Sequence, residues 1–492
     1  MLSWPRRPII YEINTLAMAP GAEPARAETR HVGDRPDAGM GCARFVWVRC
    51  GLAHGRVGTE SCRHPDRERE YRTSGRVRTS AIRLSTGGQR RICLLRPSLR
   101  RGRSTRRTQR VGDSQKTIGR SWHAIDSGFC SEPRRARPSV DHGSSAVFHS
   151  RHGRRPGRET GEFFKAGSCV VANGRDPYFP PWPDVAQLNA FSPALRQAAL
   201  STVLAIADQC DGMRCDMAML MMNPIFERTW GSRAGQKPGR EYWVELIRAV
   251  RERYPKVLFV AEAYWDLEWE LQQQGFNYCY DKRLYDRLEH GPAEQVRLHL
   301  CAELAYQEKL VRFIENHDEP RAAATFGYQK ARAVAVTFAT APGAKLFHEG
   351  QFEGYRVRLP VFLRRRPEEV PDRDLRGFYK TLLQTIRSAD FRDGEWTLCE
   401  RIGLPDNGSY LNLVAWCWEK SADRHLIVVN LSEVRSQARV KLPWADLAGR
   451  SWRLTDPLQQ MVFERAGDEL REAGLYVDLE PWGYHVLSAE SH

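Results

Sequence analysis

The chain has 492 residues, enough for a barrel-sized domain with an accessory domain, and a formal net charge of +15. No eighteen apolar residues run together and no apolar run of signal-peptide length stands near residue 1, so we expect a cytoplasmic protein without membrane contact. The twelve cysteines form no Cys-x-x-Cys pair and no cluster with histidine at zinc spacing, so neither a disulfide framework nor a structural metal is predicted.

The first predicted element is a strand at residues 8–15 (PIIYEINT), and a basic block follows it. Between residues 21 and 160, thirty arginines and one lysine stand against thirteen acids, a net charge of +18, so the rest of the chain carries −3. The block shows no sustained helical or strand period. Three interpretations compete: a disordered basic arm, an RNA-binding segment, or DNA translated in the wrong frame, where CGN codons make arginine abundant.

After residue 160 the pattern is that of an α/β protein. Ser192 as N-cap and Pro193 at the first helical position predict a helix that leads into a buried strand at residues 211–220. A second helix at 240–254 leads into a strand at 256–265. Further strands are expected at 276–281, 310–318 and 344–347. This alternation predicts a parallel sheet or barrel, and the helix-poor strands after about residue 390 predict a separate antiparallel β-sandwich.

Three polar clusters follow predicted strands, at the end where barrel active sites form. They are Arg214 with Asp216, then Glu262, then His317 with Asp318. Each cluster alone is more often structural: an ion pair, a helix cap or a solvated loop. Three of them in order on successive strands are much less expected by chance.

Together the clusters resemble the α-amylase clan, glycoside hydrolase family thirteen. GMRCDMA (212–218) is similar to the strand-four motif of that family, VAEAYWD (260–266) to its strand-five motif and FIENHDEPR (313–321) to its strand-seven motif. WPDVAQLNAFSPALR (182–196) looks like the stretch before strand four, and residues 8–15 look like the first strand. The resemblance covers residue 163 to the C-terminus and implies an α/β protein, a (β/α)8 TIM barrel with a C-terminal antiparallel β-sandwich.

The resemblance also implies roles for these residues. Asp216 would be the nucleophile of a retaining reaction, held ionised by Arg214. Glu262, which leaves an apolar strand, would have a raised pKa and would protonate the leaving oxygen. Asp318 would stabilise the oxocarbenium-like transition state.

The remaining residues of the resemblance would bind substrate. His317 would contact sugar hydroxyl groups, and Tyr264 and Trp265 would stack on sugar rings, although core packing is the more common role for either aromatic residue. The substrate implied is an α-glucan or oligosaccharide, with no nucleic-acid partner. No cofactor is predicted, and calcium, which many relatives bind, stays open because its expected ligands would fall in the basic block.

One motif of the family, Asp-x-x-x-Asn-His of strand three, is absent from the chain and would fall in the basic block. Codons for residues 122–133, read one nucleotide later, permit an apolar strand that ends in Asp-Phe-Val-Pro-Asn-His. Residues 47–58 and 18–25 also permit family-like readings in that frame. We therefore hypothesise a frame change near residues 15–17 that is undone near 158–163 and scrambles barrel strands two and three.

This hypothesis divides the chain into four parts. Residues 1–16 hold the first barrel strand, 17–161 an Arg-rich and disordered segment, 162–389 the rest of the barrel and 390–492 the sandwich. Loss of two adjacent strands would open the barrel, so we expect the chain as written to be inactive or insoluble. Three alternatives stay open: a transglycosylase of the glucanotransferase or maltosyltransferase type, an Arg-rich nucleic-acid-binding protein with a degenerate barrel, and a non-catalytic carbohydrate binder.

Overall fold

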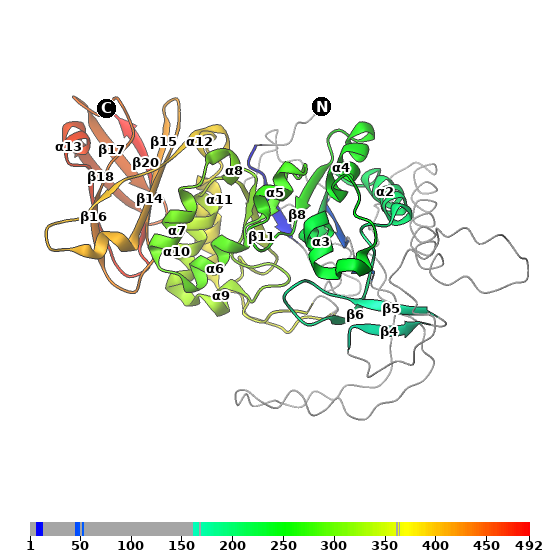
Figure 1. The fold of residues 1–492 in the computed structure, drawn as a ribbon. Helices are drawn as coiled ribbons and strands as arrows, with labels where there is room; N and C mark the ends of the chain where they lie inside the picture. Colours follow the sequence, from blue (N-terminus) through cyan, green and yellow to red (C-terminus); the bar gives the residue numbers. More distant parts are fainter. Residues whose placement is uncertain are drawn as a thin grey trace, which may run out of the picture.

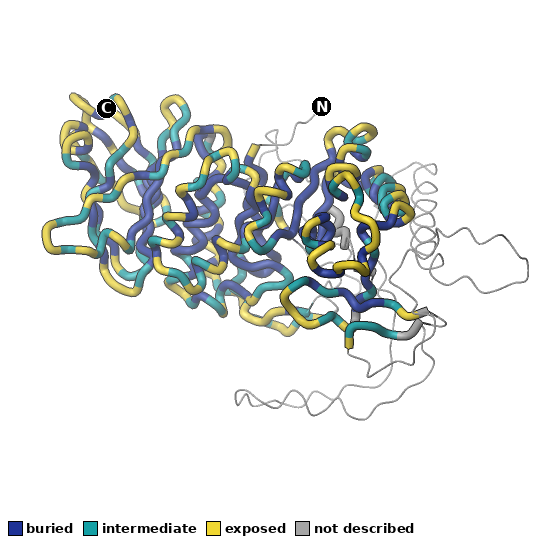
Figure 2. The backbone as a smooth tube through the Cα atoms, in the orientation of Figure 1, coloured by how far each residue is buried: buried dark blue, intermediate teal, exposed yellow. Residues whose placement is uncertain are grey.

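The computed structural model describes residues 6–12, 45–49, 52–53, 161–166, 169–360, 363 and 365–492. A parallel sheet with helices forms one half of this part, and antiparallel sheets form the other (Figure 1). Buried backbone follows the sheets of both halves, whereas exposed positions lie on outer helix faces and turns (Figure 2). No helix among these residues is long and apolar enough to cross a membrane.

The parallel sheet has seven described strands in the order β1-β11-β10-β9-β8-β7-β2. Every pairing between neighbours in this sheet is parallel. The strands are β1 (Ile9–Glu12), β2 (Phe45–Arg49), β7 (Gly212–Asp216), β8 (Leu258–Ala261), β9 (Tyr278–Tyr280), β10 (Leu310–Arg312) and β11 (Ala344–His348). The parallel α/β sheet is therefore confirmed. Within the described residues β1 and β2 are its two edges, so a closed eight-stranded barrel stays a prediction.

Strand β2 comes from the basic block, in which we expected no ordered strand. Its backbone pairs with β7 over five residues, with Arg49 opposite Asp216. The sequence FVWVR is rich in aromatic and β-branched residues, which favour strands, and the pairing gives the β7 backbone groups partners on that side. The short β3 (Leu52–Ala53) follows it. The rest of 17–160 lies outside the described residues, and the frame-change hypothesis stays a prediction.

Helices alternate with the parallel strands as the sequence predicts. Helix α2 (Pro193–Ala207) begins after Ser192, whose side chain accepts a hydrogen bond from the Leu195 N–H at 3.3 Å. Helix α4 (Tyr242–Arg253) buries an apolar stripe and packs on α2. The other helices of this half are α3 (Asn223–Trp230), α5 (Glu268–Gln273), α6 (Lys282–His290), α7 (Ala293–Leu300), α8 (Leu304–Gln307), α9 (Ala322–Thr325), α10 (Gly327–Thr340) and α11 (Arg373–Thr385), with single 3₁₀ turns η1 (Ala218–Met221) and η2 (Gly231–Ala234).

A small antiparallel sheet precedes α2, and the sequence did not lead us to expect it. It consists of β4 (Phe163–Ala166), β5 (Cys169–Gly174) and β6 (Trp182–Gln187), with β3 at its edge. Figure 1 shows this sheet projecting from the parallel one beneath α3. The loop between β5 and β6 carries the exposed aromatic residues Tyr178 and Phe179.

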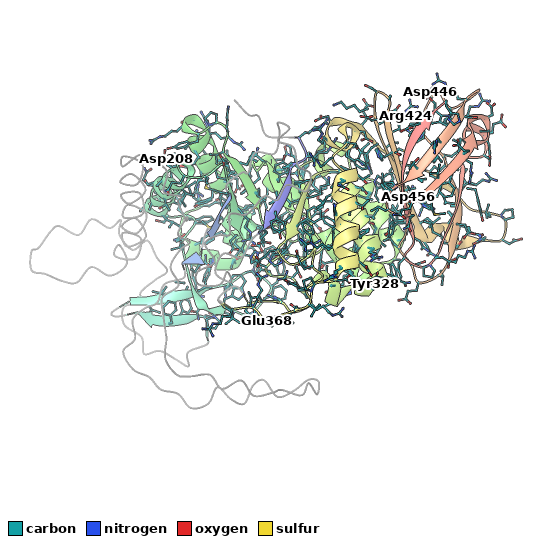
Figure 3. The ribbon with its side chains drawn as sticks, turned by 180° about the vertical axis from the view of Figure 1, so that it is seen from behind. Asp208, Tyr328, Glu368, Arg424, Asp446 and Asp456 are labelled. Atoms are coloured by element: carbon teal, nitrogen blue, oxygen red, sulfur yellow. The ribbon has the colours of Figure 1, made fainter. Side chains whose placement is uncertain are left out.

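The C-terminal half is antiparallel, as expected. One sheet has the order β12-β14-β15-β20-β17-β18 and the other β13-β16-β19. Their strands are β12 (Glu395–Leu398), β13 (Arg401–Ile402), β14 (Leu413–Lys420), β15 (Asp423–Asn430), β16 (Ser436–Val440), β17 (Ser451–Asp456), β18 (Met461–Ala466), β19 (Leu475–Leu479) and β20 (Tyr484–Ser491), with α12 (Ala389–Asp393), η3 (Gly408–Asn412) and α13 (Gly467–Glu472) beside them. The ion pair of Arg424 with Asp446 lies in this half, at the opposite end of the molecule from Asp208 (Figure 3).

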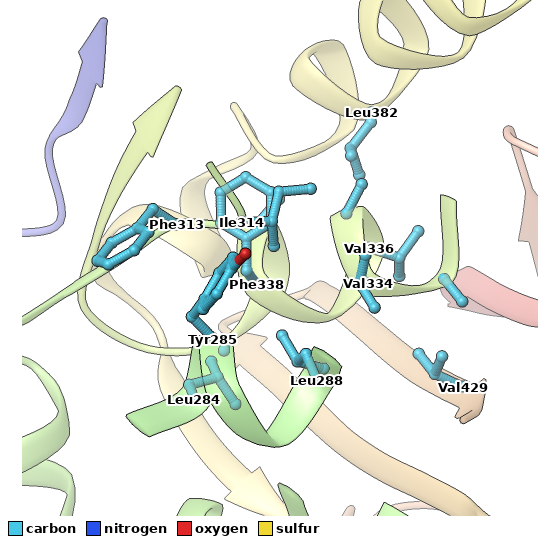
Figure 4. Close-up of a cluster of buried hydrophobic side chains, with 14 of the residues drawn as sticks. Leu284, Tyr285, Leu288, Phe313, Ile314, Val334, Val336, Phe338, Leu382 and Val429 are labelled. Carbon is cyan, nitrogen blue, oxygen red and sulfur yellow. The ribbon is translucent and has the colours of Figure 1, made fainter. Parts of the chain in front are cut away.

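The two halves share one apolar core. Side chains of α6, α10 and α11 belong to the same buried cluster as Val429 of β15 (Figure 4). The indole N–H groups of Trp416 and Trp418 donate to the Thr340 carbonyl at 3.3 and 2.7 Å. Because this carbonyl lies in the last turn of α10 and has no partner within the helix, β14 supplies its hydrogen bonds.

Candidate active site

The candidate site lies where β1, β7, β8 and β10 end. Arg214 and Asp216 alternate with Cys215 on β7, so both point to the same side of the sheet. The Glu262 N–H donates to the Cys215 carbonyl at 2.9 Å, which places Glu262 beside the end of β7. His317 and Asp318 stand in the loop that follows β10. The parallel sheet therefore brings together all three clusters predicted from the sequence.

Arg214 is the centre of the cluster, and its side chain is 4% exposed. Its Nη1 forms a short ion pair with Asp216, and its Nη2 lies 2.9 Å from Glu262 Oε1 and 3.8 Å from Asp318 Oδ2. Burial lowers the pKa of this guanidinium, but the charges of Glu262 and Asp216 outweigh burial and raise the pKa above its usual value. One cation therefore holds three carboxyl groups in place.

Glu262 is buried and has hydrogen-bond donors on both oxygens. The Tyr264 hydroxyl donates to Oε1 at 2.9 Å, and the Met217 N–H donates to Oε2 at 2.6 Å. Burial raises the pKa of Glu262, and the charges of Asp216 and Asp318 add to this rise against the opposing effect of Arg214. A carboxyl group with a raised pKa keeps its proton to higher pH, which is the property that a general acid needs.

The backbone after β7 adopts an unusual conformation that positions one of these donors. Met217 has φ of 45°, in the left-handed region that non-glycine residues rarely occupy. This turn directs its N–H toward Glu262, whose carbonyl in turn accepts from the Ala218 N–H at 3.1 Å. The turn at Met217 therefore links the strand that carries Asp216 to the strand that carries Glu262.

Asp318 is the most open of the three carboxyl groups. Its side chain is 43% exposed, against 11% for Asp216 and 5% for Glu262. The Asn316 side chain accepts from the Asp318 N–H at 2.8 Å and so fixes the turn that presents it. His317 Nε2 lies 2.9 Å from Asp318 Oδ2. Asp318 therefore marks the solvent-exposed side of the cluster.

The two predicted aromatic residues lie at the same edge with different contacts. The Tyr264 hydroxyl is bound to Glu262. Trp265 has φ of 62° and meets the Tyr178 ring edge-on, with the centroids 4.9 Å apart. Both also pack against the buried cluster of α2, α4 and β7. Tyr178 comes from the loop between β5 and β6, so it is a neighbour of the site that sequence reasoning missed.

Sequence reasoning also missed Glu12 and the Glu315–Arg321 pair. Glu12 ends β1, and its Oε1 lies 2.6 Å from His317 Nδ1. Glu315 accepts from Arg321 at 2.7 Å and from the Ala322 N–H at 2.7 Å, which ties together the two ends of the loop that carries His317. Glu12 ends an apolar strand just as Glu262 does, and that signal was present in the sequence.

In the described part of the chain, no three or more His, Cys, Asp or Glu side chains are grouped so that they could hold a metal ion. The carboxyl groups of the site instead face Arg214 and His317.

Comparison with known proteins gives matches in sequence and in fold. No family model matches the chain. The α-amylase MalA of Haloarcula japonica is 28% identical over 185 residues, which cover 36% of this chain and 25% of MalA, so the chain matches about a quarter of that relative's length. An α-amylase from H. orenii superposes with a TM-score of 0.51 at 17% identity, covering 70% of this chain and 74% of that one.

A maltogenic α-amylase, AmyB of Thermotoga neapolitana, gives a TM-score of 0.48 at 17% identity, over 62% of this chain and 68% of that one. The match to MalA is one of sequence, and the match to the H. orenii enzyme is one of fold. The chain is thus similar to the α-amylase clan, glycoside hydrolase family thirteen, in both respects.

Proposed function

We propose that the chain is a glycosidase of the α-amylase family that cleaves α-glucosidic bonds by retaining double displacement. The observation that carries this proposal is the shared cation: Asp216 and Glu262 bind the same buried Arg214, and their surroundings differ. Two carboxyl groups with different environments can act as nucleophile and as acid. The relatives named above supply the substrate class, an α-glucan or oligosaccharide.

In the first step Glu262 donates its proton to the glycosidic oxygen as the bond from that oxygen to the anomeric carbon breaks. The Asp216 carboxylate forms a covalent bond to the same carbon. In the second step ionised Glu262 takes a proton from water, and the resulting hydroxide attacks the anomeric carbon and releases Asp216. Asp318, within 3.8 Å of Arg214, faces the positive charge that develops on the sugar ring in both steps.

The same intermediate reacts with a sugar hydroxyl in a transglycosylase, so product analysis separates the two activities. We also propose that residues 17–161, which lack the strand-three motif, reduce the activity of the chain as written. A version restored to the shifted frame should then be more active and more soluble than the unrepaired chain.

The test is hydrolysis of a maltooligosaccharide by the full chain, by the frame-restored version and by the variants D216N and E262Q in both. We expect both variants to lose at least about a hundredfold in kcat/KM. The exposed carboxyl of Glu270 on α5 offers a matched control, E270Q, which should keep full activity. Proton NMR should show the α-anomer first. Full activity in E262Q or D216N, or first release of the β-anomer, would contradict the proposal.

A further inference from the structure

Glu12 and Asp318 face opposite nitrogens of the His317 ring. The Glu12 Oε1 lies 2.6 Å from Nδ1, and Asp318 Oδ2 lies 2.9 Å from Nε2. The Glu12 side chain is 6% exposed and that of His317 is 16% exposed, so water competes little for either contact. The three residues form a row from the end of β1 to the open edge of the site.

This geometry defines the protonation state of the ring. A neutral imidazole has one N–H and one lone pair, so one of the two carboxylates would face a lone pair. The imidazolium has two N–H groups and donates to both. The two hydrogen bonds together with the charges of Glu12 and Asp318 outweigh burial and raise the pKa of His317 to about 9.

Other charged groups around the row are already paired. Arg214 of β7 lies 3.8 Å from Asp318, and Tyr280 of β9 interacts electrostatically with Glu12. On β11, His348 Nδ1 lies 3.3 Å from Glu315 and 2.9 Å from Arg321 Nη1, so this second histidine belongs to a different network. In the described part of the chain, His317 is the basic side chain that forms an ion pair with Glu12.

We propose that Glu12 is a positioning residue, which holds His317 as an imidazolium and through it fixes the orientation of Asp318. This inference rests on the proposed function, because it assigns to Glu12 a part in the same reaction. Both ring nitrogens of His317 contact carboxylates, and the expectation that this residue also binds sugar hydroxyl groups stays a prediction.

The test compares the full chain with E12Q and E12D by proton NMR titration of the histidine C2 protons, with H317N identifying the His317 signal. We expect His317 to titrate near pH 9 in the unchanged chain, at least one unit lower in E12Q, and near its original value in E12D. Glu353 lies in the loop after β11 and forms no described ion pair with His317. Its variant E353Q is the matched control and should leave the titration unchanged.

Two outcomes of the titration would overturn the proposal: a His317 titration near 6.5 in the unchanged chain, or the same titration in E12Q as in the unchanged chain. The titration of His317 does not depend on turnover. A chain with no glycosidase activity would therefore count against the proposed function, but the effect of Glu12 on the pKa of His317 could still be measured. Where activity is present, E12Q should lower kcat at least tenfold at pH 8 with KM changed less than threefold. Unchanged kcat together with a lowered pKa would show that His317 does not act on Asp318.

Discussion

Replacing Arg214 with methionine removes a buried cation and keeps most of the side-chain volume. In the unchanged chain its guanidinium binds Asp216 and lies 2.9 Å from Glu262, and both carboxyl side chains are at most 11% exposed. Loss of one partner from a buried ion pair typically costs about 3–5 kcal/mol, because the remaining charge has no compensation. We therefore expect R214M to lose about 3–5 kcal/mol of unfolding free energy near neutral pH.

The pH dependence of this loss follows from Glu262. Its pKa is already raised by burial, and removal of Arg214 should raise it further. A carboxyl whose pKa is higher in the folded state than in the unfolded state stabilises the protein below its unfolded pKa and loses that contribution as pH rises. Hence the difference between R214M and the unchanged chain should be smaller at pH 5 than at pH 8.

Denaturant unfolding at pH 5 and pH 8 measures both effects. Arg248 provides the control, because its side chain is 73% exposed on α4 and pairs only with Glu252 among the contacts described. R248M should cost less than about 1 kcal/mol at either pH. A loss below about 1 kcal/mol in R214M, or a loss that grows toward pH 5, would refute the electrostatic account of the site.

Four further predictions concern separate features. The raised pKa of His317, about 9 against 6.5, stabilises the fold by about 3 kcal/mol below pH 6.5, and this contribution is lost as pH rises through 9. The free energies of unfolding of H317N and of the unchanged chain should therefore differ more at pH 6 than at pH 10, and an equal difference at both pH values would contradict this. Y264F removes the hydroxyl that donates to Glu262, so the basic limb of the pH–rate profile should move to higher pH, and an unmoved limb would contradict this. W418F removes the shorter of the two indole hydrogen bonds to the Thr340 carbonyl, so the free energy of unfolding should fall by about 1 kcal/mol or more, and an unchanged denaturant midpoint would contradict this. The DNA encoding residues 17–158 should read through in the shifted frame, and a stop codon there would exclude a frame change.

The sequence was sufficient for those parts of the site that follow from strand periodicity. Alternation along β7 places Arg214 and Asp216 on one side, and parallel strands bring Glu262 to the same edge. It was not sufficient for contacts between distant segments. Glu12 and His317 are 305 residues apart, and only the pairing of β1 with β11 brings the end of β1 into the site.

The small sheet of β3–β6 was missed for a related reason. Its strands are short, and its register is irregular between Asn173 and Gly174, so the period of two that marks a half-buried strand is weak. The loop it supports brings Tyr178 to Trp265, a contact that no local pattern indicates. Strand β2 was missed as well, because it is a five-residue, mostly apolar segment (FVWVR) within the arginine-rich block.

Trapping the covalent intermediate tests the central claim most directly. Treatment of E262Q with an activated α-maltosyl fluoride should form the glycosyl-enzyme, because fluoride leaves without acid assistance, while the loss of Glu262 slows release. Peptide mass spectrometry should then find the sugar on Asp216, with no label in D216N/E262Q. Label on Asp318 or Glu12, or turnover of the fluoride by the double variant at the rate of E262Q, would contradict the assignment of Asp216 as nucleophile.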